Sequence, residues 1–249
     1  MTGYRNIDTS KRHILSLSGG KDSSALAVYL HDKIPNLEYV FCDTGEELRE
    51  TYEFLDRIED KLKIEIKRLG SGLKFDDHLA TQKGYLPAPF ARWCTRVMKI
   101  QPYERYVGKD PAISYIGIRG DECERGGYIS KRGNIIPVYP FREDNIVLKD
   151  VYRLLIDSGL GIPKYYKWRT RSGCYFCFYQ RTVEWVGLLE NHPDLFERAR
   201  AYEKKGFTWM KGKSLQWIVD NKEAIKQRAA KRAAKEDVDK LKPCDICHL

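Results

Sequence analysis

Hydrophobic residues along the chain form short runs that alternate with longer amphipathic stretches. Apolar runs of strand length lie at 13–17, 37–42, 63–67 and 112–118. Segments with a helical pattern lie between them, at 22–32, 46–61 and 96–107. Strands separated by helices of this length are typical of βαβ units, in which parallel strands are joined by crossover helices. The pattern therefore predicts an α/β fold with a parallel-stranded sheet covered by helices on both faces.

The pattern changes after Pro140. A helix is predicted over 146–158, an irregular basic stretch over 159–171, and mostly helix over 183–235. Segment 222–240 is rich in Ala, Lys, Arg and Glu, which favours helix but offers little apolar surface to bury. We therefore expect an α/β domain over 1–180 and a helical extension over 181–249, which ends in a basic Cys-x-x-Cys tail.

The loop after the first predicted strand has the composition of a phosphate-binding loop. It reads Ser18-Gly19-Gly20-Lys21-Asp22-Ser23 and leads directly into a predicted helix. Its two glycines allow the backbone to approach a phosphate closely, while the helix N-terminus presents free N–H groups with a partial positive charge. The lysine adds a full charge and the serines add hydroxyl donors. The spacing differs from the Walker pattern, which needs four residues between its glycines.

This loop resembles the PP-loop of the ATP pyrophosphatases, which cleave ATP between its α- and β-phosphates. Further segments resemble the branch of that superfamily that contains the phosphoadenylylsulfate (PAPS) reductases. They are Asp43-Thr44-Gly45, the stretch from Trp93 to Lys99, and Gly117-Ile118-Arg119-Gly120-Asp121-Glu122 with Arg125. The resemblance covers residues 13–180 and implies an adenine nucleotide α-hydrolase-like sheet, with ATP and Mg²⁺ bound at its loops.

The resemblance also implies roles for individual residues. Residues matching the catalytic positions are Lys21, Asp22, Lys99 and Arg119. Contacts to the nucleotide are expected from three of these residues, Lys21, Asp22 and Arg119, and also from Ser18, Gly19, Gly20, Ser23, Asp43, Thr44, Gly45, Glu122 and Arg125. The planar guanidinium groups suit phosphate oxygens, which they bind through two parallel hydrogen bonds.

Three cysteines form a candidate metal site. Cys174-x-x-Cys177 has a spacing at which two thiolates can hold zinc or an iron–sulfur cluster, or can act as a redox dithiol. Together with Cys94, the pair resembles the [4Fe–4S] site of adenylylsulfate reductases and of DNA phosphorothioation pyrophosphatases. The reductases carry two adjacent cysteines upstream, whereas Trp93 precedes Cys94 here. The fourth iron is therefore either open or bound by a tail residue, Cys244 or Cys247; zinc and a site without metal remain alternatives.

The charge of the chain favours a polyanionic partner. Its formal net charge is +9. One basic stretch has aromatic residues interleaved with its cations, and its candidate nucleic-acid contacts are Lys164, Lys167, Trp168, Arg169 and Arg171. Cations hold phosphates while flat rings stack on bases, so we expect nucleic acid to bind there, although an ordinary surface loop is the alternative. A second basic stretch, 222–242, is either a similar contact or a solvated helix face.

The sequence also bears on the cellular compartment. No apolar run approaches the roughly 18 to 20 residues that a membrane span needs, and residues 1–12 lack the apolar core of a secretory signal. We therefore expect a cytoplasmic protein without membrane contact. In such a reducing compartment, metal binding or redox chemistry is a better expectation for the seven cysteines than a disulfide framework.

These observations lead to one functional hypothesis with two alternatives. We expect an ATP pyrophosphatase that adenylylates a nucleic-acid acceptor for sulfur insertion, releasing pyrophosphate and then AMP. The segments around 92–99 and 172–177 resemble the pyrophosphatases of the Dnd and Ssp phosphorothioation systems, which favours the DNA backbone over RNA and a cysteine desulfurase as sulfur donor. The alternatives are a PAPS or adenylylsulfate reductase that makes sulfite, and a tRNA thiolase. The sequence does not determine the oligomeric state, and a homodimer is one possibility.

Overall fold

The computed structural model describes residues 4–5, 7–122, 124, 126–127, 132–204 and 206–241. The chain divides into two compact units, Met1–Cys174 and Tyr175–Leu249. The two units meet between Cys174 and Tyr175, a few residues before the boundary expected at 180. Cys174 and Cys177 therefore belong to different units. Within the described ranges, no helix is long and apolar enough to cross a membrane.

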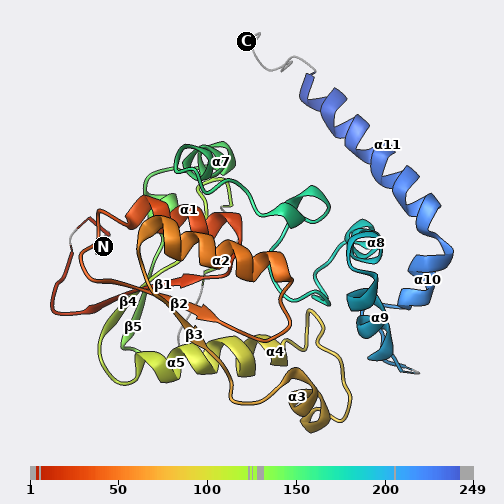
Figure 1. Ribbon diagram of the computed structural model, residues 1–249, viewed down its shortest axis with the longest axis horizontal. Coiled ribbons are helices and arrows are strands. Elements are labelled where there is room, and N and C mark those ends of the chain that lie inside the picture. Colours follow the sequence, from red (N-terminus) through yellow and green to blue (C-terminus); the bar gives the residue numbers. More distant parts are fainter. Residues whose placement is uncertain are drawn as a thin grey trace. The chain divides into compact units, whose positions relative to one another are not determined.

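The first unit is built on a five-stranded parallel sheet (Figure 1). Its strands are β1 (Arg12–Leu17), β2 (Leu37–Cys42), β3 (Ile66–Leu69), β4 (Ala112–Tyr115) and β5 (Ile135–Val138). They are arranged in the order β3-β2-β1-β4-β5. The central strand β1 pairs Leu15 with Tyr39 of β2 on one side and with Tyr115 of β4 on the other. The predicted α/β fold with a parallel sheet is confirmed.

Three strands differ from the prediction. Strand β3 begins three residues later than the apolar run at 63–67, and β4 ends at Tyr115, so that residues 116–118 belong to the following loop. Strand β5 was not predicted, because Pro137 lies inside it and proline cannot donate a hydrogen bond to a neighbouring strand. The strand is tolerated because β5 lies at the edge of the sheet, where one side needs no partner.

Helices cover both faces of the sheet (Figure 1). Helices α1 (Lys21–Leu30), α2 (Arg49–Leu62) and α7 (Leu148–Asp157) lie on one face, and α5 (Gln101–Val107) lies on the other. Successive side chains of a strand point to opposite faces, so Leu15 and Phe41 join the core under α1 and α2, whereas Ile14 and Val40 pack with α5. The smaller elements of this unit are α3 (Phe75–Thr81), α4 (Trp93–Thr95), the π-helical turn η1 (Arg96–Ile100), α6 (Pro140–Glu143) and the 3₁₀ turn η2 (Lys164–Lys167).

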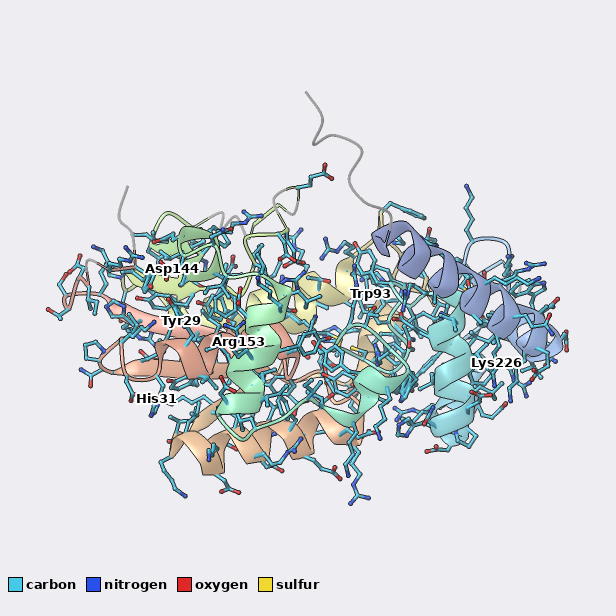
Figure 2. All side chains as sticks on the ribbon, turned by 90° about the horizontal axis from the view of Figure 1, so that it is seen from above. Tyr29, His31, Trp93, Asp144, Arg153 and Lys226 are labelled. Atoms are coloured by element: carbon cyan, nitrogen blue, oxygen red, sulfur yellow. The ribbon has the colours of Figure 1, made fainter. Side chains whose placement is uncertain are left out.

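A cluster at the end of α6 fixes the segment that follows β5. Asp144 accepts hydrogen bonds from Tyr4 and from Tyr29 of α1, the latter at 2.5 Å, and it also pairs with Arg5. Tyr29 and Asp144 lie near each other in Figure 2. The next residue, Asn145, lies against Gly120, where an added Cβ would come within 2.9 Å of its Oδ1. The cluster thus ties α1 to the backbone behind the loop that follows β4.

The second unit is helical, as predicted. It contains α8 (Thr182–Asn191), α9 (Pro193–Ala201), α10 (Leu215–Asp220) and α11 (Lys222–Leu241). Its core includes Phe176, whose ring stacks on Trp209 at a centroid distance of 4.9 Å, and the buried Trp185. Lys222 and Lys226 of the basic helix α11 both pair with Glu190 of α8 at 2.9 Å, so part of the basic charge is used within this unit.

Candidate functional site

The sheet places two of the predicted motifs side by side. The chain runs from β1 toward β2 on one side and returns to β4 on the other, so the loops after β1 and β4 diverge at a topological switch point, where ligands bind in open α/β sheets. The phosphate loop follows β1 and the Arg119 segment follows β4. A Cβ added to Gly117 would lie 3.0 Å from the backbone oxygen of Asp22, so the two loops are in close contact.

The phosphate loop is a tight turn that leads into α1. Gly19 has φ +66°, and an added Cβ would lie 2.4 Å from Thr51 Cγ2 of α2. A Cβ on Gly20 would lie 2.5 Å from Ser172 Oγ. Ser23 Oγ accepts the backbone N–H of Ser18 at 3.0 Å, which closes the turn. Both glycines are therefore required by close packing, and the loop sets its backbone against the N-terminus of α1.

A network of charges surrounds this loop. Asp22 binds Lys21 Nζ through one carboxylate oxygen at 3.0 Å and Arg119 Nη1 through the other at 2.7 Å. Arg119 also pairs with Asp121 at 2.8 Å and lies 3.7 Å from Glu122. Burial opposes the charge of Arg119, but its carboxylate partners outweigh burial and raise its pKa. Arg119 is therefore a fixed cation beside the phosphate loop.

The Asp43-Thr44-Gly45 motif is linked to Lys99 by a residue that was not predicted from the sequence. Glu47 accepts a hydrogen bond from Thr44 Oγ1 at 2.7 Å and pairs with Lys99 Nζ at 3.6 Å. Its side chain is only 1% exposed. The sequence placed Glu47 inside a helix predicted over 46–61, whereas α2 begins at Arg49, so that Glu47 lies in the loop after β2. Two consecutive acidic residues directly after the Asp-Thr-Gly motif were the available signal.

The same loop is held in shape by Asp43. Its Oδ1 accepts the backbone N–H of Gly45 at 2.8 Å and the hydroxyl of Tyr52 at 2.8 Å. Gly45 has φ +73°, a backbone conformation that residues other than glycine rarely adopt. Asp43 therefore stabilises the turn, while Thr44 faces Glu47.

The described residues show no preformed metal site. In the ranges that the structure describes, no three His, Cys, Asp or Glu side chains form a group that would hold a metal ion. Cys174 instead lies 3.3 Å from Thr44 Oγ1 and 3.9 Å from Glu47 Oε1. Cys94 lies on α4 in the first unit, whereas Cys177 belongs to the second. The expected set of Cys94, Cys174 and Cys177 therefore includes residues of both units and stays a prediction.

Residues 164–172, which include the aromatic-basic segment, contact the phosphate loop, and we call them the strap. Tyr165 donates its hydroxyl to the carbonyl oxygen of Gly19 at 2.7 Å, and the hydroxyl of Tyr166 accepts the backbone N–H of Lys21 at 3.0 Å. Ser172 Oγ lies 3.2 Å from Ser18 Oγ. Neither tyrosine was among the predicted site residues, because the partners in these contacts are more than 140 positions apart in the sequence.

The predicted nucleic-acid contacts of this segment separate into two groups. Lys164, Lys167 and Arg171 are exposed, and Trp168 is half-buried. Arg169 is only 2% exposed, and its guanidinium donates to the carbonyl oxygens of Gly173 and Cys174. The charge of Arg169 thus binds the backbone turn before Cys174, and its expected contact with nucleic acid stays a prediction. The remaining predicted residues Arg125, Cys244 and Cys247 lie outside the described residues.

Comparisons with known proteins agree with this architecture. Residues 12–178 match the family model of the phosphoadenosine phosphosulfate reductase domain. An uncharacterized protein of Methanocaldococcus jannaschii is 31% identical over 198 residues, which cover 74% of this chain and 45% of the relative. The adenosine 5'-phosphosulfate reductase of Staphylococcus haemolyticus is 28% identical over 113 residues, which cover 44% of this chain and 45% of the reductase. The matched region thus spans less than half of either relative.

A solved structure shares the fold. The PAPS reductase from Candida auris, solved as a phosphate complex, superposes with a TM-score of 0.51 at 11% sequence identity, covering 68% of this chain and 82% of the reductase. The family model covers more than half of the chain and includes the phosphate loop, the Glu47 loop, Lys99 and Arg119. This chain therefore belongs to the phosphoadenosine phosphosulfate reductase domain family.

Proposed function

We propose that this chain is an ATP pyrophosphatase that adenylylates a nucleic-acid acceptor, with the DNA backbone favoured, so that sulfur can replace oxygen. The observation that carries the proposal is the meeting of the phosphate loop with Arg119 at the switch point of the sheet. Backbone N–H groups, Lys21 and Arg119 there form a site for a polyanion. In the loop after β2, the strand next to β1 on the side away from β4, Glu47 pairs with Lys99.

The charged residues of the chain would act mainly on the phosphates. The N–H groups at the start of α1 and the Lys21 ammonium would receive the β- and γ-phosphates of ATP. Arg119 would exchange its contact with Asp22 for a phosphate oxygen, which bears developing charge in the transition state. Mg²⁺ bound to the nucleotide would help to neutralise the leaving pyrophosphate.

The reaction would proceed in two displacements. An acceptor oxygen attacks the α-phosphorus of ATP, the bond to the bridging oxygen of the β-phosphate breaks, and pyrophosphate leaves with the electron pair. The acceptor oxygen then bridges the acceptor and AMP, as a mixed phosphoric anhydride where the acceptor is a DNA phosphate, and it leaves readily as part of AMP. A cysteine desulfurase would supply a persulfide, whose terminal sulfur attacks the activated acceptor atom and displaces AMP together with that oxygen. A thiol reductant then cleaves the S–S bond and supplies two electrons, so that one sulfur atom remains on the acceptor.

The surface supports a nucleic-acid acceptor. The chain carries a net charge of +9, and the exposed cations Lys164, Lys167 and Arg171 lie on the segment that straps the phosphate loop. A polyanion bound by these cations would lie next to the nucleotide. Among sulfur-inserting pyrophosphatases, those of the Dnd and Ssp DNA phosphorothioation systems remain the proposed branch.

The proposal is tested by product analysis. Protein, ATP, Mg²⁺, DNA, a cysteine desulfurase, cysteine and a thiol reductant are combined, and the DNA is digested and searched for phosphorothioate dinucleotides by mass spectrometry. Pyrophosphate release with sulfur incorporation supports the proposal, and Lys21→Ala should abolish both while the circular dichroism spectrum is unchanged. ATP turnover without sulfur in DNA, but with sulfur in tRNA under the same conditions, would make the protein a tRNA thiolase.

A second candidate is a sulfonucleotide reductase. It is favoured by the similarity to adenosine 5'-phosphosulfate reductases from Staphylococcus haemolyticus and Salinibacter ruber, which are 28% and 25% identical over the matched regions. Such an enzyme would bind a sulfonucleotide at the same loops and release sulfite with thioredoxin as the reductant. Sulfite formation from adenylylsulfate or PAPS, without pyrophosphate release from ATP, would establish this alternative.

A further inference from the structure

A tyrosine hydroxyl binds a backbone N–H group of the phosphate loop to which a phosphate ligand would also bind. The hydroxyl oxygen of Tyr166 accepts the backbone N–H of Lys21 at 3.0 Å. It also lies 3.1 Å from the point that a Cβ on Gly20 would occupy. The Tyr166 ring lies 5.2 Å from Lys21 Nζ. The side chain of Tyr166 thus contacts the loop through its oxygen and through its ring.

This N–H group belongs to the part of a helix that binds anions. Lys21 is the first residue of α1, a helix of ten residues, and its N-cap residue is Gly20, which has no side chain to cap the helix. The N–H groups of a first helical turn have no partner within the helix, and they carry the positive end of its dipole. A phosphate bound by this loop would therefore accept the same N–H that Tyr166 now accepts.

The Tyr166 hydroxyl is a weaker acceptor than the ligand it would stand in for. Burial raises the pKa of Tyr166 to about 12, so its hydroxyl is neutral at physiological pH. A hydrogen bond to an anionic phosphate oxygen is roughly twice as strong as one to a neutral oxygen. Phosphate can therefore displace the hydroxyl, but part of its binding energy is offset by the loss of the tyrosine contact.

The segment around Tyr166 is held against the loop by other contacts. Tyr165 is buried, donates its hydroxyl to Gly19 O at 2.7 Å, and has its ring centroid 4.8 Å from that of Tyr166. Ser172 Oγ lies 3.2 Å from Ser18 Oγ. Because Tyr165 and Ser172 bind other atoms of the loop, the strap can stay attached when the Tyr166 hydroxyl gives up its N–H group.

We propose that Tyr166 sets the affinity of the phosphate loop by holding the N–H of Lys21 until a phosphate ligand takes it. The inference rests on the proposed function for the identity of the loop as a phosphate site. Tyr166 is a positioning residue in this account, since it acts on the ligand through a backbone group. By binding this N–H, the hydroxyl stabilises the conformation of the empty loop. It also lowers the affinity of the loop for phosphate ligands, which favours release of pyrophosphate after the reaction.

The test compares two neighbouring tyrosines. Tyr166→Phe keeps the ring but frees the N–H of Lys21, so Mg-pyrophosphate should bind roughly two- to tenfold more tightly, the change that corresponds to one ordinary hydrogen bond. Tyr165→Phe is the matched control, because it removes a hydroxyl that donates to a carbonyl oxygen and frees no N–H group. It should leave the affinity unchanged or lower it. Isothermal titration calorimetry measures both, with thermal unfolding as a check on folding.

The sign of the change decides the inference. A folded Tyr166→Phe variant that binds Mg-pyrophosphate with equal or lower affinity than the wild type would overturn it, since a tyrosine that only supports the loop cannot tighten binding when removed. Equal tightening in Tyr165→Phe would overturn it as well. Wild-type protein that binds pyrophosphate but neither turns over ATP nor modifies nucleic acid would end the proposed function, and the comparison of the two variants would still decide the role of Tyr166.

Discussion

At the scale of single residues, Asp22 and Glu47 have complementary places in the site. Asp22 holds two cations, Lys21 and Arg119, at 3.0 and 2.7 Å. Glu47, buried in the loop after β2, holds Lys99 at 3.6 Å. Cations that are already paired with carboxylates stay in place at little entropic cost when a phosphate arrives. The two acidic residues thus position the groups that would bind the anion.

Loss of the Glu47 charge should therefore impair ATP turnover through Lys99. Glu47→Gln keeps the size of the side chain and an acceptor for Thr44, but it removes the charge opposite Lys99. We expect kcat/KM for ATP to fall roughly tenfold, the size typical of a lost charged hydrogen bond. Glu53→Gln is the control, since Glu53 is 47% exposed and pairs with Arg49 on the surface of α2. Equal kinetics in the two variants would contradict the role of Glu47.

The buried thiol of Cys42 gives a separate prediction. Burial raises the pKa of Cys42 to about 11, and its Sγ donates a hydrogen bond to Lys99 O at 3.3 Å. Since the thiolate is the reactive form, the folded protein should leave Cys42 unmodified by iodoacetamide at pH 8. Peptide mapping by mass spectrometry should find it alkylated only after unfolding in urea. Rapid alkylation in the folded protein would show that the thiol is accessible and ionised.

At the scale of elements, the loops after β1 and β4 depend on each other. Gly117 has no space for a side chain, because a Cβ would lie 3.0 Å from Asp22 O and 3.2 Å from Ser23 N. Both are backbone atoms at the start of α1, so neither can move without displacing the phosphate loop. Lys99 lies on η1, a π-helical turn between α4 and α5, and turns of this kind are frequent at functional sites.

Substitution of Gly117 should therefore damage binding and stability together. We expect Gly117→Ala to lower the free energy of unfolding by about 1–3 kcal/mol, as overpacking does, and to weaken binding of Mg-pyrophosphate. Gly133→Ala is the control, because an added Cβ there meets no atom of the described chain within 4 Å. Urea unfolding and calorimetry measure the two effects. A Gly117→Ala variant with wild-type affinity would contradict the close packing of the two loops.

The sequence predicted elements well where apolar runs and glycine motifs coincide. Strands β1 and β2, helix α1 and the phosphate loop were all placed by such patterns. Strand β5 was missed because Pro137 interrupts its pattern, and Glu47 was missed because the start of α2 was placed three residues early. Contacts made by Tyr165 and Tyr166 connect residues more than 140 positions apart, and periodicity carries no information about such pairs.

At the scale of the whole molecule, the basic charge is divided among surfaces with different partners. Lys222 and Lys226 are paired with Glu190 within the second unit. Lys164 and Lys167 are exposed on the strap over the phosphate loop in the first unit. If nucleic acid is the acceptor, the strap lysines should contribute more to its binding than the paired lysines of α11.

A pair of double variants tests this division. Lys164→Ala with Lys167→Ala should weaken DNA binding and reduce the slope of log K against log salt by about one to two, since up to two phosphate contacts are lost. Lys222→Ala with Lys226→Ala removes the same charge and should have a smaller effect. Fluorescence anisotropy over a salt series measures both. Equal losses would indicate that net charge alone, rather than the strap, holds the DNA.

The loop between β1 and α1 is proposed to direct cleavage of ATP between its α- and β-phosphates in the presence of an acceptor. Parallel reactions with ATP labelled at the α- or the γ-phosphorus, with nucleic acid and a sulfur donor present, identify the bond that is cleaved. We expect the α-label in AMP and the γ-label in pyrophosphate, and neither product with Lys21→Ala. Release of labelled orthophosphate with ADP would contradict this proposal, as would intact ATP when a parallel reaction with a sulfonucleotide and thioredoxin yields sulfite.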